Sequence, residues 1–392
     1  MNQIYFNNCL TSKPAPEVID AMLPYMKEDF QLPGTFIAKG EKIAADLESF
    51  RKTVADSMSA KPSEIHFTTG GTSANNIAIK GFLSANAHQG THLICSVIDY
   101  PDLLTNAAFF EKSGFEVTYL PADWDGFIDL EELKKAIRPD TILFMTTLAN
   151  HTVGTIQPLK EIKDILDAAD HKIAVHVDAC EAYARIPINV QELGIDLMSI
   201  SAHKIHGPKG VGALYQRKGI QLAQFKHGIN RVDNLETGGI SVASIAGFSK
   251  AVELAFDNFE ENTSKIRSLS NHLLQKIEEK IPYTTLNGAR GEKRAPHHIN
   301  VSFQYIEGES IMMMLDLNGI SVATGSACAS QGLKANYVLM ALGRTHEQSH
   351  GSIKFTLSRY NTMEEIDFTV EKLAGIVKEL RSRSPLYEDN RN

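Results

Sequence analysis

The chain has 392 residues, of which 43% are hydrophobic and 22% are charged, as in ordinary globular proteins. Its formal net charge is −8 and no basic patch stands out, which argues against nucleic acid as a partner. No stretch approaches the roughly 18 apolar residues of a membrane span, so we expect no membrane partner either.

The first residues lack the charged and apolar regions of a secretory signal, so we expect a cytoplasmic protein. The four cysteines are Cys9, Cys95, Cys180 and Cys328, and their spacing fits neither a metal site nor a disulfide framework. We therefore expect no bound metal and a reducing compartment.

Strand-like and helical patterns alternate through the first two thirds of the chain. We predict strands at 65–69, 92–97, 116–120, 141–146 and 173–177, and helices at 44–58, 74–85, 130–136 and 159–168. The strands are nearly continuous apolar runs, as in a parallel sheet that is covered on both faces. The pattern predicts an α/β fold in which a largely parallel sheet lies between helices.

The pattern changes near residue 254. We predict a long charged helix at 252–280, strands at 298–303 and 352–357, and a last helix at 363–381. This mixture is typical of a smaller α+β domain. We therefore predict a large domain at 14–255 and a small domain made of 1–13 and 256–392.

The stretch 199–210, Ser-Ile-Ser-Ala-His-Lys-Ile-His-Gly-Pro-Lys-Gly, comes soon after an apolar run that ends at Asp178. Lys204 in this turn can form a Schiff base with the aldehyde of pyridoxal 5′-phosphate (PLP). Asp178 can keep the pyridine nitrogen protonated, so that the ring serves as an electron sink. Ser201 and His203 can hydrogen-bond the phosphate or the ring. Alone, such a lysine is usually a solvated loop residue and such an aspartate a helix cap, but the combination indicates a PLP site.

A second motif, Thr69-Gly70-Gly71-Thr72, separates a predicted strand from a predicted helix. Backbone N–H groups at the start of a helix form an anion site where small residues allow close approach. The motif alone is more often a plain turn. Beside a Schiff-base lysine, we interpret Gly71 and Thr72 as part of a phosphate-binding cup.

Tyr100, His151 and Glu181 follow the ends of predicted strands. Ligands bind at this edge of open α/β sheets. The Tyr100 ring can stack on the pyridine face. Without the neighbouring motifs, all three would be interpreted as ordinary surface or core residues.

The loop 323–330, Ala-Thr-Gly-Ser-Ala-Cys-Ala-Ser, places one cysteine among small residues. Most cysteines are buried and structural, as we expect for Cys9 and Cys180. A loop of small residues argues against core burial at Cys328. We therefore interpret Cys328 as a nucleophile.

Together these motifs resemble those of class V aminotransferase-fold PLP enzymes, and specifically of NifS/IscS-like cysteine desulfurases. The similar segments span nearly the whole chain, at 69–76, 176–179, 201–204, 323–330 and 351–367. The resemblance implies the fold-type I architecture, with a mainly parallel seven-stranded sheet. It also implies a homodimer whose sites are completed across the interface.

The resemblance further implies an activity. Lys204 would remove the α-proton of L-cysteine, and Cys328 would attack the substrate sulfur. L-alanine would leave, and the Cys328 persulfide would pass its sulfur to an acceptor protein.

Several residues depart from the family pattern. Tyr100 stands where the family has a histidine that stacks on the ring and acts in acid–base catalysis, and a phenol with a pKa of roughly 10 is a poor base. Glu181 replaces a glutamine that hydrogen-bonds the 3-oxygen of the cofactor. An ionised Glu181 would be repelled there, so we expect it to be protonated or paired with His151.

Other departures concern the substrate and the partner subunit. His151 replaces an asparagine near the substrate carboxylate, and Asn150 lies beside it in the same predicted substrate-binding segment. Lys354 replaces an arginine that grips the carboxylate, and it offers a point charge instead of a bidentate fork. Gly239 replaces a threonine that reaches the phosphate of the partner subunit.

Three hypotheses follow. The first is a cysteine desulfurase. The second is a selenocysteine lyase or another C–S or C–Se lyase, because a selenol is a better leaving group and needs weaker acid–base groups. The third is an inactive homologue that acts as a scaffold subunit, although the presence of Lys204 and Cys328 argues against it.

Overall fold

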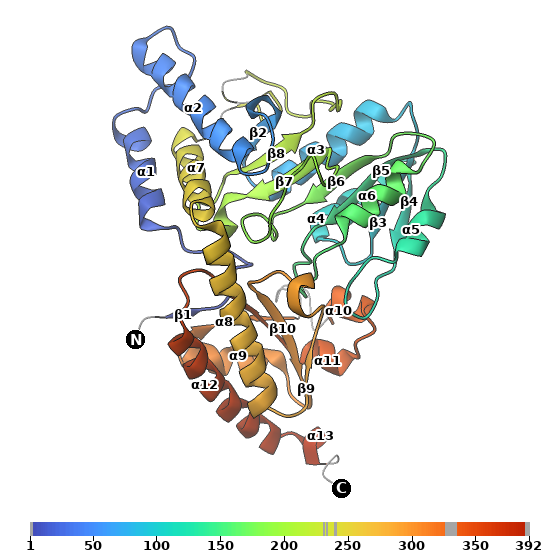
Figure 1. Ribbon diagram of the computed structural model, residues 1–392, viewed down its shortest axis with the longest axis vertical. Coiled ribbons are helices and arrows are strands. Elements are labelled where there is room, and N and C mark those ends of the chain that lie inside the picture. Colours follow the sequence, from blue (N-terminus) through green and yellow to red (C-terminus); the bar gives the residue numbers. More distant parts are fainter. Residues whose placement is uncertain (1–2, 230–231, 233, 239–240, 326–334, 389–392) are drawn as a thin grey trace.

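The computed structural model describes residues 3–229, 232, 234–238, 241–325 and 335–388. A large α/β part carries helices on both faces of a central sheet. A smaller part with the C-terminal helices lies below it in the view of Figure 1.

The central sheet has seven strands within the described residues, in the order β2-β8-β7-β6-β5-β3-β4. Their bounds are β2 Ile65–Thr68, β3 His92–Ser96, β4 Glu116–Leu120, β5 Thr141–Thr147, β6 Ala174–Asp178, β7 Leu197–Ser201 and β8 Gly212–Gln216. Neighbours from β4 to β7 are parallel, whereas β8 is antiparallel to both β7 and β2. The predicted mainly parallel seven-stranded sheet is confirmed, although apolar periodicity had not singled out β7 and β8.

Helices cover both faces of this sheet. They are α1 Pro16–Lys27, α2 Ala38–Asp56, α3 Gly71–Asn86, α4 Pro101–Lys112, α5 Leu130–Ala136, α6 Leu159–Asp167 and α7 Val242–Phe256. Side chains along β5 point alternately to the two faces of the sheet, so they belong to two separate core layers. Phe144 packs in the layer with α1, α2 and α5 to α7, whereas Leu143 and Met145 pack under α3 and α4. Both faces are thus buried, as the continuous apolar strands predict.

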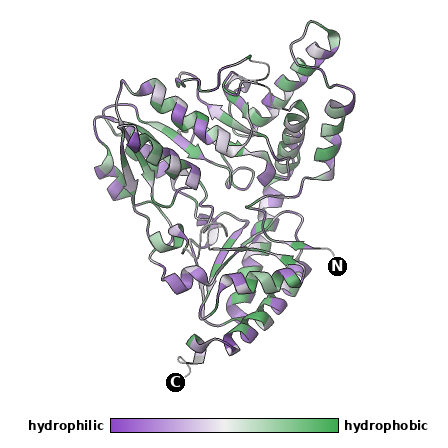
Figure 2. Cartoon of the chain, turned by 180° about the vertical axis from the view of Figure 1, so that it is seen from behind, coloured by the Kyte–Doolittle hydropathy of each residue, from purple (hydrophilic) through white to green (hydrophobic). Residues whose placement is uncertain are grey.

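The smaller part has its own hydrophobic core around Phe303 and Phe355. Its antiparallel sheet runs β12-β13-β10-β9, with β9 Thr284–Leu286, β10 His298–Phe303, β12 Ala323–Thr324 and β13 Ser352–Thr356. Its long helices are α8 Phe259–Lys280, α9 Gly308–Leu317 and α12 Met363–Ser382, and Figure 2 shows their hydrophobic and hydrophilic residues on different faces. The short helices are α10 Tyr337–Ala341, α11 His346–His350 and α13 Pro385–Glu388.

The N-terminal segment joins this smaller part. Strand β1 Ile4–Tyr5 pairs in parallel with β11 Ile320–Ser321, and Phe6 lies in the core of the smaller part. The separate cores support the predicted division at residues 13/14 and 255/256, which stays a prediction. No helix in the described ranges combines the length and the apolar character needed to cross a bilayer.

The predicted single helix at 252–280 is wrong. The segment belongs to two helices, α7 and α8, which are separated at Asp257 and Asn258. The Phe256 and Phe259 rings stack across the break, with centroids 5.3 Å apart. Helix α7 packs against α1 and α2 in the large part, whereas α8 packs against α12 in the smaller part, so the break lets the chain serve two cores.

The carboxyl ends of the central parallel strands lie at one edge of the sheet. Thr147 at the end of β5 is the register partner of Asp178 at the end of β6, and Asp178 is the partner of Ser199 in β7. This edge is where open α/β sheets place their ligands. The predicted cofactor-binding residues are gathered there.

Candidate active site

Lys204 is placed by a tight turn directly after β7. Ser201 ends the strand, and a short 3₁₀ helix carries the chain from Ala202 to Lys204. A Cβ at Gly207 would lie 2.7 Å from the carbonyl oxygen of Ala202, so only glycine lets the turn close this tightly. The Lys204 side chain is 11% exposed and points into the protein, which excludes the ordinary interpretation of a solvated loop lysine.

Glu181 is the main partner of this lysine. The Lys204 Nζ donates to Oε1 of Glu181, and the other carboxylate oxygen, Oε2, lies 3.7 Å from Nε2 of His297. Burial alone would raise the pKa of Glu181, but the Lys204 ammonium and the His297 contact hold it well below its usual range. Burial alone would lower the pKa of Lys204, but the Glu181 carboxylate raises it above its usual range.

This arrangement corrects the expectation for Glu181. The carboxylate is ionised and paired with Lys204, and its imidazole neighbour is His297 rather than His151. The reason is topological, because the turn after β6 aims residue 181 at the end of β7 and at the start of β10.

Tyr100 covers the lysine from another side. Its backbone N–H donates to Oγ1 of Thr147, and the preceding Asp99 accepts bonds from Ser96 and Thr147 that hold this loop. The Lys204 Nζ lies 5.6 Å from the centroid of the Tyr100 ring. Burial raises the pKa of Tyr100 to about 12, so the phenol stays protonated near neutral pH.

Asp178 is held rigidly at the end of β6. Its Oδ2 accepts a hydrogen bond from Nδ2 of Asn75 at 2.8 Å, and its Oδ1 accepts one from the backbone N–H of Cys180 at 2.9 Å. Burial raises the pKa of this carboxyl, and in the described part of the chain no cation forms an ion pair with it. A cationic group beside Asp178 would supply the missing countercharge.

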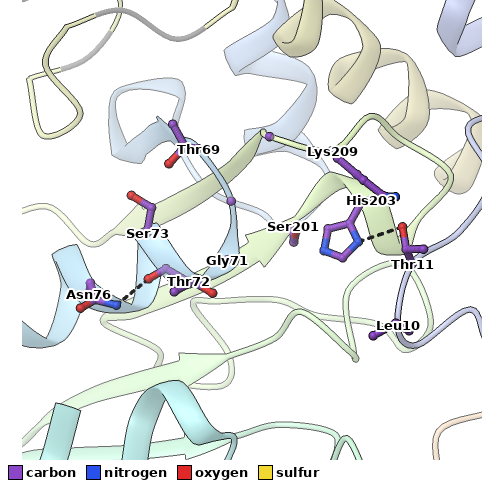
Figure 3. Close-up of a pocket in the computed structure, with 12 residues that line it drawn as sticks. Leu10, Thr11, Thr69, Gly71, Thr72, Ser73, Asn76, Ser201, His203 and Lys209 are labelled. Atoms are coloured by element: carbon purple, nitrogen blue, oxygen red, sulfur yellow. Dashed lines mark hydrogen bonds between the residues drawn. The ribbon is translucent and has the colours of Figure 1, made fainter. Parts of the chain in front are cut away.

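The Thr69–Thr72 motif forms the wall of a cleft of 710 Å³ (Figure 3). Gly70 has φ +146°, which side-chain-bearing residues rarely adopt, and from there α3 begins with its free N–H groups. Ser201 and His203 line the same cleft. The buried Oγ of Ser201 has no hydrogen-bond partner in the described part of the chain, as expected of a group that awaits an anion.

A smaller cavity of 60 Å³ lies behind this cleft. It shares Gly71, Thr72, Ser201 and His203 with the cleft. It adds Tyr100, Asp102, Thr147, Asp178, Cys180, Glu181 and Lys204 to its lining. The structure therefore brings together every predicted cofactor-binding residue around two adjoining hollows.

The predicted substrate residues lie beside them at the junction of the two parts. Asn150 donates to the carbonyl of Ile98 and accepts from the N–H groups of Thr152 and Val153, which favours a positioning role. The carbonyl of His151 accepts a hydrogen bond from Nζ of Lys354 at 3.0 Å. The two predicted substrate residues His151 and Lys354 are therefore in direct contact.

The His151 ring is partly buried and packs edge-on against Tyr100, with centroids 5.0 Å apart. Burial, with Lys354 nearby, lowers the pKa of His151 to about 3, so this imidazole is neutral. Its Nε2 lies 3.2 Å from the hydroxyl of Tyr337, which in turn donates to the carbonyl of Asp99.

Two predicted residues, Cys328 and Gly239, lie outside the described residues. The chain enters the Cys328 loop through β12, where Ala323 is the register partner of Lys354. Cys9 and Cys180, the two thiols that we predicted to be structural, are buried. In the ranges that the structure covers, no group of three or more His, Cys, Asp or Glu side chains is arranged to hold a metal ion.

Sequence reasoning missed four contributors. Asn75 lies in the predicted phosphate motif but was given no role, although it binds Asp178. Thr11 belongs to the N-terminal segment, and its Oγ1 lies 3.3 Å from Nδ1 of His203, within hydrogen-bonding distance. His297 and Tyr337 come from the smaller part, far along the chain. Only the tertiary fold brings them to the ends of β5 to β7.

The chain is similar to known proteins over nearly its whole length. Residues 4–368 match the family model described as aminotransferase class-V. A "Cysteine desulfurase IscS" from Dictyoglomus turgidum is 42% identical over 99% of this chain and 98% of its own length.

Solved structures are similar over comparable lengths. A structure titled "NIFS-LIKE PROTEIN" superposes with a TM-score of 0.90 at 30% identity, covering 96% of this chain and all of that one. A structure titled "SspA in complex with cysteine" superposes with a TM-score of 0.79 at 28% identity, covering 92% of this chain and all of that one.

The buried ion pair makes a prediction about the cofactor-free protein. Lys204→Met leaves the Glu181 charge without its main partner, and we expect it to cost about 3 kcal/mol of unfolding free energy at neutral pH. Adding Glu181→Gln should restore most of that loss. Denaturant unfolding of the wild type and the two variants measures this, and a double variant as unstable as the single one would contradict it.

The same series has a defined pH dependence. In Lys204→Met, burial raises the folded-state pKa of Glu181 above its unfolded value of about 4.3. At pH values above the folded-state pKa of Glu181, Lys204→Met therefore loses the whole of the expected unfolding free energy. The loss becomes smaller as the pH falls, because the buried carboxyl takes up a proton. The double variant lacks this group and should not show this relief on acidification.

Proposed function

Since the chain belongs to the class-V aminotransferase family, we propose that it is a PLP-dependent cysteine desulfurase that converts L-cysteine to L-alanine. The observation that carries this proposal is the placing of Lys204 and Asp178 on one small cavity beside an anion-binding cleft. Class V aminotransferases and cysteine desulfurases are PLP-dependent enzymes.

The residues present fit the cofactor. The start of α3, with Gly71, Thr72, Ser201 and His203, would hold the phosphate, and the unpartnered Ser201 hydroxyl supports this. Asp178 would bind the pyridine nitrogen, and Glu181 lies within reach of the same cavity. When bound, PLP supplies an aldehyde for Lys204 and an electron sink for the bonds at the substrate α-carbon.

The surrounding side chains divide the remaining work. Lys204 moves the proton at the α-carbon, because the neutral phenol of Tyr100 and the neutral imidazole of His151 are poor acceptors. Tyr100 covers the amine and excludes water from that face. Lys354, with Asn150 and His151 beside it, would bind the substrate carboxylate as a point charge.

Cys328 would receive the sulfur. Its thiolate attacks the substrate sulfur, an S–S bond forms, and the C–S bond breaks. The substrate carbon keeps the electron pair and takes a proton, so alanine leaves and a persulfide stays on Cys328. The loop that carries Cys328 starts beside the Lys354 strand, which supports its access to the site.

The product persulfide implies a sulfur acceptor protein, and we place the enzyme in the cytoplasm. Selenocysteine remains the alternative substrate, because a selenol needs less acid–base help than a thiol. The inactive-scaffold hypothesis has less support, since the Lys204 and Asp178 geometry is complete.

The first test uses Cys328→Ala with L-cysteine and L-selenocysteine as substrates. We expect the variant to keep the PLP absorbance, because Lys204 still holds the cofactor. It should lose alanine and persulfide formation from cysteine, because the thiolate that attacks the substrate sulfur is gone. Cys95→Ala, which changes a buried thiol on β3, serves as the control. Full activity of Cys328→Ala would contradict the assignment, and a dominant kcat/KM for selenocysteine would favour the lyase.

The second test uses Ser201→Ala. Removing a buried hydroxyl without a partner should leave the unfolding free energy of the cofactor-free protein unchanged or raise it by up to about 1 kcal/mol. The affinity for PLP should fall about tenfold, because one hydrogen bond to the anion is lost. Ser249→Ala removes a comparable unpartnered hydroxyl in α7 and should leave PLP affinity unchanged. Equal PLP titrations for the two variants would contradict the phosphate role of Ser201.

We also propose a homodimer. Large apolar side chains are exposed at the end of α1 and in the segment that links it to α2, namely Met26, Phe30, Leu32, Phe36 and Ile37. Exposed apolar patches of this kind mark interaction surfaces. Phe225, also exposed, lines a hollow that shares Ser73 and Asn76 with the phosphate cleft, so a second copy could cover its mouth.

The third test disrupts this apolar segment. Phe36→Asp, at a fully exposed side chain, should shift the protein from dimer to monomer in analytical ultracentrifugation, because a charge would be buried in the interface. Leu317→Asp changes a side chain that is 86% exposed at the end of α9, outside the α1–α2 segment, and should leave the dimer intact. A wild-type monomer would contradict the proposal.

A further inference from the structure

The contact between Glu181 and His297 joins the two parts of the molecule. Glu181 follows β6 in the large part, and His297 directly precedes β10 in the smaller part. Both side chains are buried, and they leave the two carboxylate oxygens with different partners: Oε1 faces Lys204 and Oε2 faces His297. The Nδ1 of His297 has no hydrogen-bond partner in the described residues.

This geometry raises a question about the Lys204 proton. An ammonium has no lone pair, so Lys204 must lose a proton before it can attack an aldehyde or accept the α-proton. The amine is buried, which leaves the proton few places to go. Once the amine is neutral, the Glu181 charge is also left without its partner, and an uncompensated buried carboxylate is costly.

Asp102 also lines the cavity, and its Oδ2 has no hydrogen-bond partner in the described residues, but the Lys204 Nζ is bonded to Glu181. The other titratable groups around the pair are poorly placed to take this proton. Tyr100 is a neutral phenol, and Cys180 is a buried thiol whose pKa burial raises. Arg185 donates to the carbonyl of Lys204 and remains a cation. The remaining neighbours face elsewhere, since Asp178 binds Asn75, His203 contacts Thr11 and His151 contacts Tyr337.

We propose that Glu181 and His297 form a proton-accepting pair that takes the Lys204 proton whenever this amine becomes neutral, with His297 as the positioning residue. The inference deepens the proposed function and rests on it. In the step, one N–H bond of the ammonium breaks and its electron pair stays on Nζ. The proton joins the carboxylate. Oε2 of Glu181 and Nε2 of His297 lie 3.7 Å apart in the cofactor-free protein, so the two side chains must approach to hydrogen-bonding distance to share it.

The charges balance through this step. An ammonium and a carboxylate become an amine and a protonated pair, so the buried cluster stays neutral overall. Condensation of the neutral amine with an aldehyde then releases only water. A protonated Glu181 also becomes a hydrogen-bond donor, and it no longer repels an anionic oxygen on a ligand in the cavity. Burial, with Arg185 nearby, lowers the pKa of His297 to about 4, which opposes a full imidazolium and favours a shared proton.

The test follows the rate at which cofactor-free protein captures PLP, read from absorbance over a range of pH. Glu181→Gln removes the counter-charge of Lys204, so capture at neutral pH should become faster and its profile should move to lower pH. His297→Asn keeps a polar side chain but cannot hold the proton. We expect it to slow capture on the order of a hundredfold, as for loss of an acid–base group, and to move the profile to higher pH.

The double variant separates a proton-handling role from a structural one. In the Glu181→Gln background, His297→Asn should have no further effect, because the acceptor is already gone. His92→Gln changes a buried imidazole on β3 that bonds Thr118 and Thr141, and it should behave as the wild type. Equal slowing by His297→Asn in both backgrounds would overturn the proposal. If His297→Asn does not fold, His297→Gln takes its place in both backgrounds.

A second readout needs no variant to be active. Infrared and ¹⁵N NMR difference spectra, PLP-loaded minus cofactor-free, should show a protonated-carboxyl band or a His297 shift toward imidazolium, and the carboxyl band should be absent in Glu181→Gln. If neither signal changes, the pair does not hold the proton. Borohydride trapping with peptide mapping checks the premise separately. Labelling of Lys204 without these signals overturns only the pair, whereas no labelling of Lys204 overturns the proposed function and with it the pair.

Discussion

The buried ion pair between Lys204 and Glu181 is the constraint on which the rest of the site depends. A lysine amine in a protein interior would lose its charge, and a lone carboxylate there would gain a proton. Together they stay ionised at neutral pH, with the pKa of the acid lowered and that of the base raised. The reactive amine is therefore held in one direction, but it is also kept unreactive until its proton is moved.

Backbone register decides which side chains meet this pair. Parallel strands β5, β6 and β7 end at one edge, so the residues that follow them converge without any long loop. The Asp99 carboxylate then fixes the turn that carries Tyr100, and Asn75 fixes Asp178. Tyr100 and Asp178, which would touch a ligand, are thus held by groups that are themselves buried and hydrogen-bonded.

The sequence predicted the elements that follow simple periodicity and the residues that lie near one another in the chain. The parallel strands, Lys204, Asp178 and the glycine turn at 70–71 were found because motif and strand end lie close together. The prediction of a single helix at 252–280 was wrong because the chain breaks at Asn258, between a helix that packs in one core and a helix that packs in the other. The spacing of apolar residues along the chain does not show which core a helix packs in. His297 was missed because nothing in its neighbourhood suggests a partner so far away in the chain.

The atypical residues of the site can be understood as one change. A tyrosine with a pKa of about 12 lies over the lysine, where similar enzymes have a histidine, so that face holds no acid or base that works near neutral pH. Glu181 stands where similar enzymes have a glutamine, and its carboxylate lies beside the buried His297. Neither change is favourable alone, because a bare glutamate would repel an anionic ligand oxygen and a bare tyrosine would leave the lysine proton without an acceptor. Under the proposed proton transfer, the two changes together move proton handling from the ring-stacking face to the junction of the two parts, where Glu181 and His297 meet.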